Sequence, residues 1–187
     1  MGLLALLLLQ HARAPARVDA DGFIVLLEDQ DRSLWNQAMI NEGLALLDKA
    51  IRHDARDTYQ VQAAIAALHA RAARPEDTDW AQIERLYATL EKLQPSPVVT
   101  LNRAVAVSKV SGAEAALAMV EPLAPRLARY FHFHGVRAAL LIQLGRNEDA
   151  RVALDHAIAL ANTAAEATHL RQQLDQLTKK RRPKPRP

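Results

Sequence analysis

The chain has 187 residues, half of them apolar, 4% aromatic and 24% charged, and it contains no cysteine. This length fits one large domain or two small ones, the charged fraction excludes an integral membrane protein, and the lack of cysteine excludes disulfides and thiolate metal sites. The formal net charge of +3 arises in residues 179–186, which hold six basic residues and no acid. The remaining 18 basic and 21 acidic residues form a body of about −3.

Residues 2–14 are expected to form the first helix, which ends near Pro15. The apolar run Leu3–Leu9 resembles the core of a signal peptide, but no basic residue precedes it and it is too short to cross a bilayer. Polar and basic residues follow the run immediately. We therefore interpret it as a buried helix that belongs to a longer protein.

An acidic segment follows at residues 18–32 and shows no helical periodicity. Its Asp21-Gly22 pair favours a turn. The apolar run Phe23–Leu27 is compatible with either a strand or an extended linker, and acidic residues follow it directly. The segment is therefore expected to be irregular.

Acids in this segment have part of the spacing of an EF-hand calcium loop. Asp19, Asp21 and Glu28 would fill three of its positions. Arg17, however, stands where the first carboxylate ligand belongs, and polar residues follow Glu28 where an exiting helix would begin. We therefore interpret these acids as an Asx turn and helix caps.

Three helices are predicted next, at about 33–53, 57–73 and 80–93. Asp57 and Asp79 each stand three residues before a glutamine, which is the spacing of an N-terminal capping box. The first of the three helices is expected to start from Asp31 or Ser33 as its N-cap residue.

Residues 95–161 contain one pattern twice, which is a long helix, a glycine break and a short alanine-rich helix. The two glycines, Gly112 and Gly145, lie 33 residues apart, close to the ~34-residue period of a tetratricopeptide repeat. Units of this kind stack on their neighbours, because one unit alone cannot bury its apolar face.

Capping residues place the helix starts in this half of the chain. Ser96-Pro97 is expected to begin one helix, and Ser111 with Glu114 to cap the short helix 113–123. Thr163 with Glu166 has the same capping spacing. The later helices are predicted at about 129–144, 147–161 and 164–178.

The predicted fold is all-α, with antiparallel helix pairs that form a tetratricopeptide-like, right-handed superhelix. One domain is expected over residues 1–178. Its parts are an N-terminal helix with the acidic segment (1–32), helix pairs (33–94), two repeat units (95–161) and a capping helix (162–178). Residues 179–187 are basic and interrupted by proline, which predicts a disordered tail.

No catalytic, metal-binding or cofactor-binding residue can be assigned. His132 and His134 would stand about 200° apart on a helix, so they could not hold one metal ion together. We expect both to be partly buried among aromatic residues. No nucleophile motif or glycine-rich phosphate loop is present. We therefore expect neither an enzyme nor a bound cofactor.

Four stretches of the chain carry a more specific resemblance. They are DGFIVLLEDQDRSLW (21–35), YQVQAAIAALHA (59–70), ARPEDTDWAQIERLYATL (73–90) and PSPVVTLNRAVAVSKVSG (95–112). Together they resemble the C-terminal extension of a group of bacterial extracytoplasmic-function (ECF) RNA polymerase sigma factors. That group carries a tetratricopeptide-like domain after its two sigma-core regions, and the resemblance covers roughly residues 1–178.

The resemblance implies a cytoplasmic protein whose full-length form recruits core RNA polymerase to promoters. The sigma core itself has no counterpart in this chain, so the chain alone is not expected to direct transcription. Phe23 also departs from the pattern, because family members usually carry an acidic residue there. The expected partners are the protein's own sigma core, RNA polymerase or a signalling protein, and no membrane.

Two interpretations of segment 19–35 follow. In the first, it contacts the sigma core or another polypeptide, and in the second it plugs the end of the helical array and satisfies its caps. The candidate contact residues are Asp21, Glu28, Asp29, Asp31, Arg32 and Trp35. The chain is accordingly expected to be a regulatory interaction domain of an ECF sigma factor. The alternative is a free-standing tetratricopeptide scaffold that binds peptides.

The basic tail is a candidate for polyanion contact or a simple aid to solubility. Its six cations are Lys179, Lys180, Arg181, Arg182, Lys184 and Arg186. No aromatic residue is present to stack on bases, so any contact with DNA would be nonspecific and sensitive to salt.

Overall fold

A computed structural model describes residues 1–53 and 57–179 of the chain. The fold is all-α, as predicted. The α-helices are α1 (Gly2–His11), α2 (Gln37–Arg52), α3 (Thr58–Arg71), α4 (Trp80–Leu93), α5 (Pro97–Ser111), α6 (Ala113–Val120), α7 (Ala124–Leu127), α8 (Phe131–Gln143), α9 (Asn147–Leu160) and α10 (Ala164–Lys179). Short 3-10 turns are η1 (Ala14–Ala16), η2 (Arg32–Leu34), η3 (Pro75–Asp77) and η4 (Glu121–Leu123).

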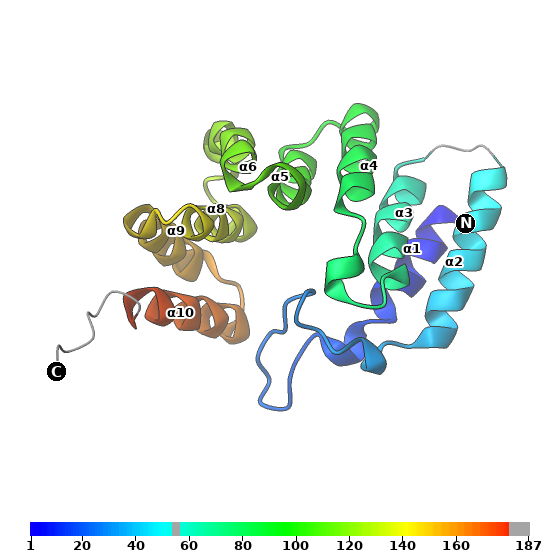
Figure 1. Ribbon diagram of the computed structural model, residues 1–187, viewed down its shortest axis with the longest axis horizontal. Coiled ribbons are helices and arrows are strands. Elements are labelled where there is room, and N and C mark those ends of the chain that lie inside the picture. Colours follow the sequence, from blue (N-terminus) through cyan, green and yellow to red (C-terminus); the bar gives the residue numbers. More distant parts are fainter. Residues whose placement is uncertain (54–56, 180–187) are drawn as a thin grey trace.

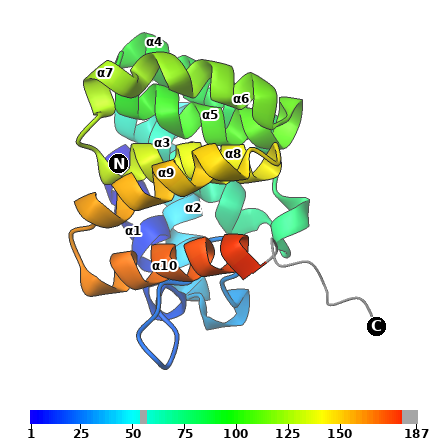
Figure 2. The same cartoon turned by 90° about the vertical axis from the view of Figure 1, so that its left-hand side faces the viewer.

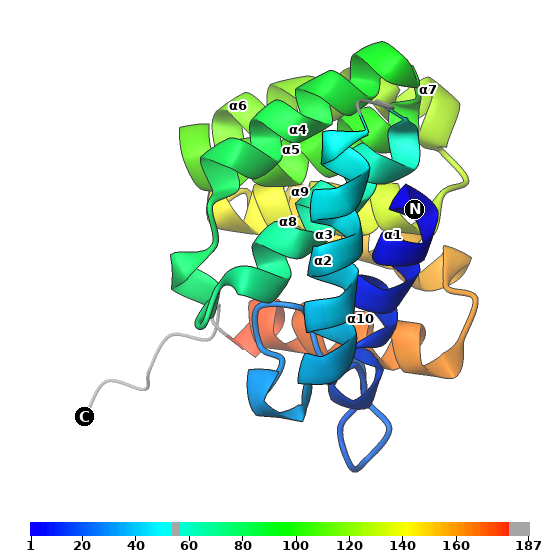
Figure 3. The same cartoon turned by 90° about the vertical axis from the view of Figure 1, so that its right-hand side faces the viewer.

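The helices form an arc in which each packs mainly against its neighbours in the sequence (Figure 1). Helix α1 packs against α2 and α3, after which the contacts run from α3 through α4, α5, α6, α8 and α9 to α10. The irregular stretch between α1 and α2, residues 12–36, lies at the open side of the arc in Figure 1. We call it the stretch below. Views from the two ends show the helices stacked in layers along the arc (Figures 2 and 3).

Capping residues start several of these helices where the sequence predicts it. The side chains of Asp57, Asp79 and Ser96 accept hydrogen bonds from the backbone N–H groups of Gln60, Gln82 and Val98. Each such cap satisfies one of the free N–H groups of a first turn and contributes roughly 1 kcal/mol.

The reciprocal capping box at the start of α10 is also confirmed. The Thr163 hydroxyl accepts from the Glu166 N–H at 3.2 Å, and the Glu166 carboxylate accepts from the Thr163 N–H at 3.0 Å. Helix α10 continues to Lys179, one residue beyond the predicted domain end. The rest of the predicted tail, 180–187, lies outside the described residues.

The predicted start of α2 was wrong. The Asp31 carboxylate accepts from the Ser33 N–H and caps the 3-10 turn η2, after which the chain extends through Trp35. Asn36 then caps α2 by accepting from the Met39 N–H at 3.0 Å. Of the two predicted caps, Asp31 thus precedes a 3-10 turn and Ser33 lies within it, and α2 begins only after Trp35 and Asn36.

The predicted cap of α6 was also wrong. Ser111 is the last residue of α5, and the N-cap of α6 is Gly112 at φ 89°. A single residue at positive φ reverses the chain between the two helices, which only glycine does readily. The predicted helix 113–123 is α-helical only as far as Val120. The 3-10 turn η4, which contains Pro122, forms the remaining residues.

Buried positions recur at a fixed interval in the second half of the arc. Ala104 and Ala138, like Ala116 and Ala150, lie 34 residues apart and are fully buried. Val107 with Leu141, and Val120 with Leu154, repeat the same interval. The two predicted units therefore place equivalent side chains in the core, and small residues at the contacts allow the helices to approach closely.

Candidate partner-binding groove

The irregular stretch at the open side of the arc contains a compact turn at residues 19–23, after η1. The Asp19 carboxylate accepts from the N–H groups of Asp21 and Phe23, at 3.0 and 2.8 Å, and Gly22 adopts φ 83°. This is an Asx turn, as predicted. The apolar run after it makes one isolated bridge, between Val18 and Ile24, and its last residue, Leu27, begins another turn.

Arg32 fastens the end of this stretch to α3. Its Nη1 atom donates to the carbonyl oxygens of His69 and Ala72, at 2.7 and 2.5 Å. These carbonyls lie at the C-terminal end of α3, where free C=O groups and the helix dipole favour a cation. The Arg32 guanidinium also lies 4.7 Å from the ring centroid of Trp35, which is 3% exposed. Arg32 and Trp35 therefore hold the stretch in place.

Glu28 joins the same stretch to a distant helix. Its carboxylate lies 2.8 Å from Lys109 Nζ on α5, 81 residues away in sequence. The Lys109 ammonium also lies 5.7 Å from the ring centroid of Trp80, at the start of α4. Both charged side chains are more than a third exposed, so the ion pair is expected to contribute less than about 1 kcal/mol. It fixes the position of the stretch more than it stabilises the fold.

A groove of about 620 Å³ lies between this stretch and the helices of the arc. One wall consists of Leu26, Leu27, Glu28 and Arg32 from the stretch, and η3 with the start of α4 forms an end. The opposite wall is mainly apolar and comes from α5 and α8, with Val105, Val136, Ala139 and Leu140. We call this space the partner-binding groove. An apolar floor with charged edges suits an amphipathic polypeptide segment.

The structure divides the six candidate contact residues into three sets. Glu28 and Arg32 line the groove. Trp35 is buried, and Asp31 caps η2, where hydrogen bonds from Ser33 lower the pKa of the Asp31 carboxyl. Asp21 and Asp29 are exposed, and their carboxylates have no ion-pair partner within residues 1–53 and 57–179.

Several groove residues were not predicted. Lys109, Val136 and Leu140 belong to helices whose local pattern indicates only amphipathic packing. Trp80, at the start of α4, is half-buried and also lines the groove. No short-range signal in the sequence identifies these positions, because the groove forms only when the arc brings α5 and α8 opposite the stretch.

The two histidines considered as metal ligands occupy different environments. His134 is buried, with Nε2 2.8 Å from the Ala128 carbonyl oxygen, whereas His132 is exposed. The prediction that both are partly buried was therefore wrong for His132. Within the described part of the chain, no three His, Asp or Glu residues gather closely enough to hold a metal ion. No described helix is both long and apolar enough to span a bilayer.

The chain is an all-helical protein with a groove at the open side of its arc. A family model described as "Family of unknown function (DUF6596)" matches residues 1–51, which include α1, the stretch that lines the groove and nearly all of α2. The chain is also 67% identical over 177 residues to "Uncharacterized protein R00370" of Rhizobium meliloti (strain 1021). That match covers 95% of this chain but 42% of the relative, so the chain spans less than half of the relative's length. No solved structure matches the chain.

Proposed function

We propose that this chain is the regulatory interaction domain of an ECF RNA polymerase sigma factor. It acts in the cytoplasm by holding the sigma core through the partner-binding groove and the exposed face of the stretch beside it. The observation that carries the proposal is the position of segment 21–35. The stretch with the most specific resemblance to these sigma factors lines the groove, and it carries the exposed carboxylates of Asp21 and Asp29, which have no ion-pair partner among the described residues.

The internal repetition supports a tetratricopeptide-like arrangement. Equivalent buried residues 34 apart, such as Ala104 and Ala138, match the period of that repeat. Glycines at positive φ, Gly112 and Gly145, end the first helix of each unit. Arrays of such units form a right-handed superhelix with a concave binding surface, and we assign this chain to that architecture.

Different residues of the stretch have different roles, so both sequence-based interpretations apply to it. Asp31, Arg32 and Trp35 build the local structure, as a plug would. Asp21 and Asp29 are free to pair with basic residues of a partner, and Leu26, which is 39% exposed, offers an apolar contact beside them. Charged residues at the edge of an interface set partner choice, while the apolar groove supplies the buried area.

Binding between the chain and the sigma core of the intact protein tests this proposal. Ala139 is exposed and lines the groove, so Ala139→Trp would fill it while leaving the fold intact. We expect this variant to bind at least tenfold more weakly than the wild type in a pull-down or titration with the purified sigma core. Ala115→Trp, at an exposed site on α6, is the matched control and should bind normally.

A charge-reversal variant tests the contribution of the acidic edge separately from that of the groove. Asp29→Lys should slow association and make binding less sensitive to salt, whereas Asp175→Lys, on exposed α10, should change neither. Normal binding by both Ala139→Trp and Asp29→Lys would refute the assigned surface. If the wild-type chain fails to bind the sigma core at all, the sigma-factor assignment itself is wrong.

The mainly apolar wall of the groove also supports the second candidate function, a tetratricopeptide scaffold for peptides. The two functions differ in the partner. A scaffold would bind a separate peptide in the presence of saturating sigma core, whereas a sigma-factor domain would release the peptide under that competition.

A further inference from the structure

A second cavity, of about 480 Å³, lies beside the partner-binding groove. Leu27 and His69 line both spaces and therefore stand between them. The walls come from α1, α3, α4 and the first turns of α5, which are neighbours along the arc (Figure 1). This volume is in the range of sites that hold small molecules.

One end of the cavity carries a cation without a matching acid. Arg13, in the turn after α1, lines the cavity, and its Nη2 atom donates to Gln10 Oε1 at 2.6 Å. Within residues 1–53 and 57–179, Arg13 has no carboxylate partner. A half-buried guanidinium whose partners among the described residues are a neutral amide and the ring of Trp35 retains much of the desolvation penalty of its charge.

Two further arginines lie near Arg13, and Asp77 and Glu76 offset part of the charge of Arg32. Arg17 donates to the backbone oxygen and Oε1 of the same Gln10, at 2.9 and 3.2 Å. Arg13 and Arg32 lie 5.9 and 4.7 Å from the ring centroid of the same Trp35. Burial and the charges of Arg17 and Arg32 lower the pKa of Arg13 to about 10, so its side chain stays charged at neutral pH.

The rest of the cavity is neutral and in part apolar. Leu6, Leu27, Ile65 and Leu90 form apolar surface next to the Arg13 end. Gln62, Gln94 and Asn102 add amide groups. Burial, Arg13 and Arg32 lower the pKa of His69 to about 4, so this side chain adds no charge at neutral pH. The cavity thus combines one cationic end with an uncharged body.

We propose that this cavity binds a small organic anion, whose carboxylate or phosphate group pairs with Arg13 and whose apolar body lies against Leu27, Ile65 and Leu90. The inference does not depend on the sigma-factor assignment, because it rests on a different cavity and different residues. It connects the two sites through Leu27. An anion in the cavity would hold the wall of the neighbouring groove in place.

The test uses the full chain and simple probes. The n-alkanoates from acetate to octanoate, hexyl phosphate and inorganic phosphate are titrated at constant ionic strength, with melting temperature and calorimetric binding as readouts. We expect saturable stabilisation that strengthens about fourfold for each added CH₂ until the cavity is filled, as transfer of apolar surface predicts. Comparison of the affinity of hexanoate with that of hexyl phosphate shows whether the site prefers a carboxylate or a phosphate group.

Substitutions locate the site. Arg13→Gln should weaken octanoate binding at least tenfold, and Arg13→Lys should restore part of it. The matched control is Arg126→Gln, on exposed α7, which should bind like the wild type. Ala66→Phe keeps Arg13 but occupies the cavity, so it should also lose binding.

Three results would overturn the proposal. One is the lack of any saturable stabilisation of the wild-type chain. Another is equal binding by Arg13→Lys, Ala66→Phe and the wild type, which would place the anion elsewhere even if Arg13→Gln fails to fold. The third is affinity that does not change with chain length, which would exclude an apolar body in the cavity.

Discussion

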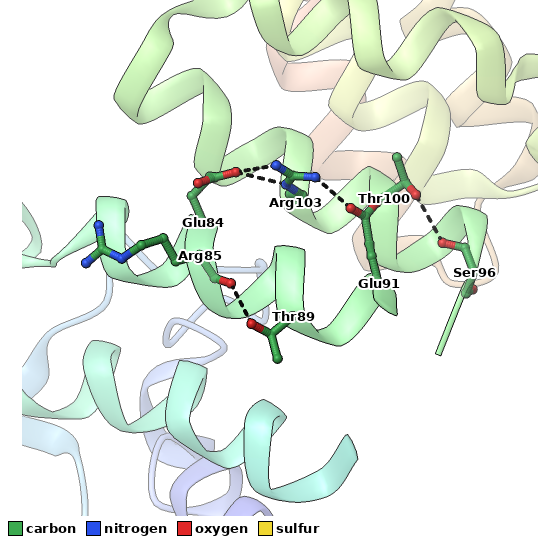
Figure 4. A network of polar contacts seen from close by, with 7 residues as sticks. All are labelled: Glu84, Arg85, Thr89, Glu91, Ser96, Thr100 and Arg103. Atoms are coloured by element: carbon green, nitrogen blue, oxygen red, sulfur yellow. Dashed lines mark hydrogen bonds and ion pairs between the residues drawn. The ribbon is translucent and has the colours of Figure 1, made fainter. Parts of the chain in front are cut away.

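Replacing Arg103 by methionine is predicted to destabilise the contact between α4 and α5. The Arg103 guanidinium donates to Glu84 Oε1 through Nε and Nη2, at 2.9 and 2.6 Å, and to Glu91 Oε2 through Nη1, at 2.8 Å. Figure 4 shows the single guanidinium on α5 reaching two carboxylates on α4. These hydrogen bonds raise the pKa of Arg103, consistent with a strongly favoured charged form.

The expected magnitude follows from the exposure of the three side chains, which is 29% for Arg103, 24% for Glu84 and 20% for Glu91. Loss of one partner costs roughly 3–5 kcal/mol for a buried pair and about 0–1 kcal/mol for an exposed one. The partly exposed network lies between these limits, so we expect Arg103→Met to lower the free energy of unfolding by about 2 kcal/mol. For a chain of this size, the melting temperature would fall by about 4–8 °C.

Urea denaturation of Arg103→Met, of Glu84→Gln and of the double variant Arg103→Met/Glu84→Gln measures the loss and the coupling between the two residues. Arg151→Met is the control, because Arg151 is 55% exposed and its carboxylate neighbours lie 3.6 and 4.0 Å away. That variant should lose less than about 0.5 kcal/mol. An equal loss in Arg103→Met and Arg151→Met would show that the network contributes no more than an ordinary surface pair.

Two other predictions concern single residues. Burial and the charges of Arg13 and Arg32 lower the pKa of His69 from its ordinary value of 6.5 to about 4 in the folded chain. The folded state therefore favours the neutral ring, and stability present above pH 6.5 is lost as the pH falls toward 4. Between pH 7.5 and 5 this amounts to about 2 kcal/mol, which urea denaturation should detect in the wild type and find reduced in His69→Gln. Gly112→Ala should lower the free energy of unfolding by about 1 kcal/mol, because φ is 89° there and no nearby atom would contact the new methyl group, so that strain alone acts. Ala113→Gly serves as its neighbour control for backbone entropy, and an unchanged midpoint in Gly112→Ala would show that the turn tolerates a side chain.

Local chemistry made much of the fold predictable. The caps at Asp57, Asp79 and Ser96 depend on residues two or three positions away, so the sequence contains the whole interaction. The wrong predictions for the starts of α2 and α6 also concern caps, but here local chemistry was not sufficient. Several polar residues near each start could cap, and the choice among them depends on where the packed helices require the chain to turn.

The candidate site was predictable only in part. The stretch that contains Glu28, Arg32 and Trp35 was identified from its own composition. Its partners were not, because Lys109 lies 81 residues from Glu28 and the carbonyl oxygens of His69 and Ala72 belong to backbone that any residue supplies. These groups come close together only when the whole arc has folded, so the sequence of a single helix does not predict their contact.

The placement of the stretch between α1 and α2 has a consequence for cooperativity. In an array where each helix touches mainly its neighbours, one section can melt while the next persists. Here one span of chain is bonded to the end of α3 through Arg32 and to α5 through Glu28, so it links two helices that α4 separates in the sequence. When α4 loosens, this link between α3 and α5 remains, but its exposed ion pair contributes less than about 1 kcal/mol and adds little to cooperativity.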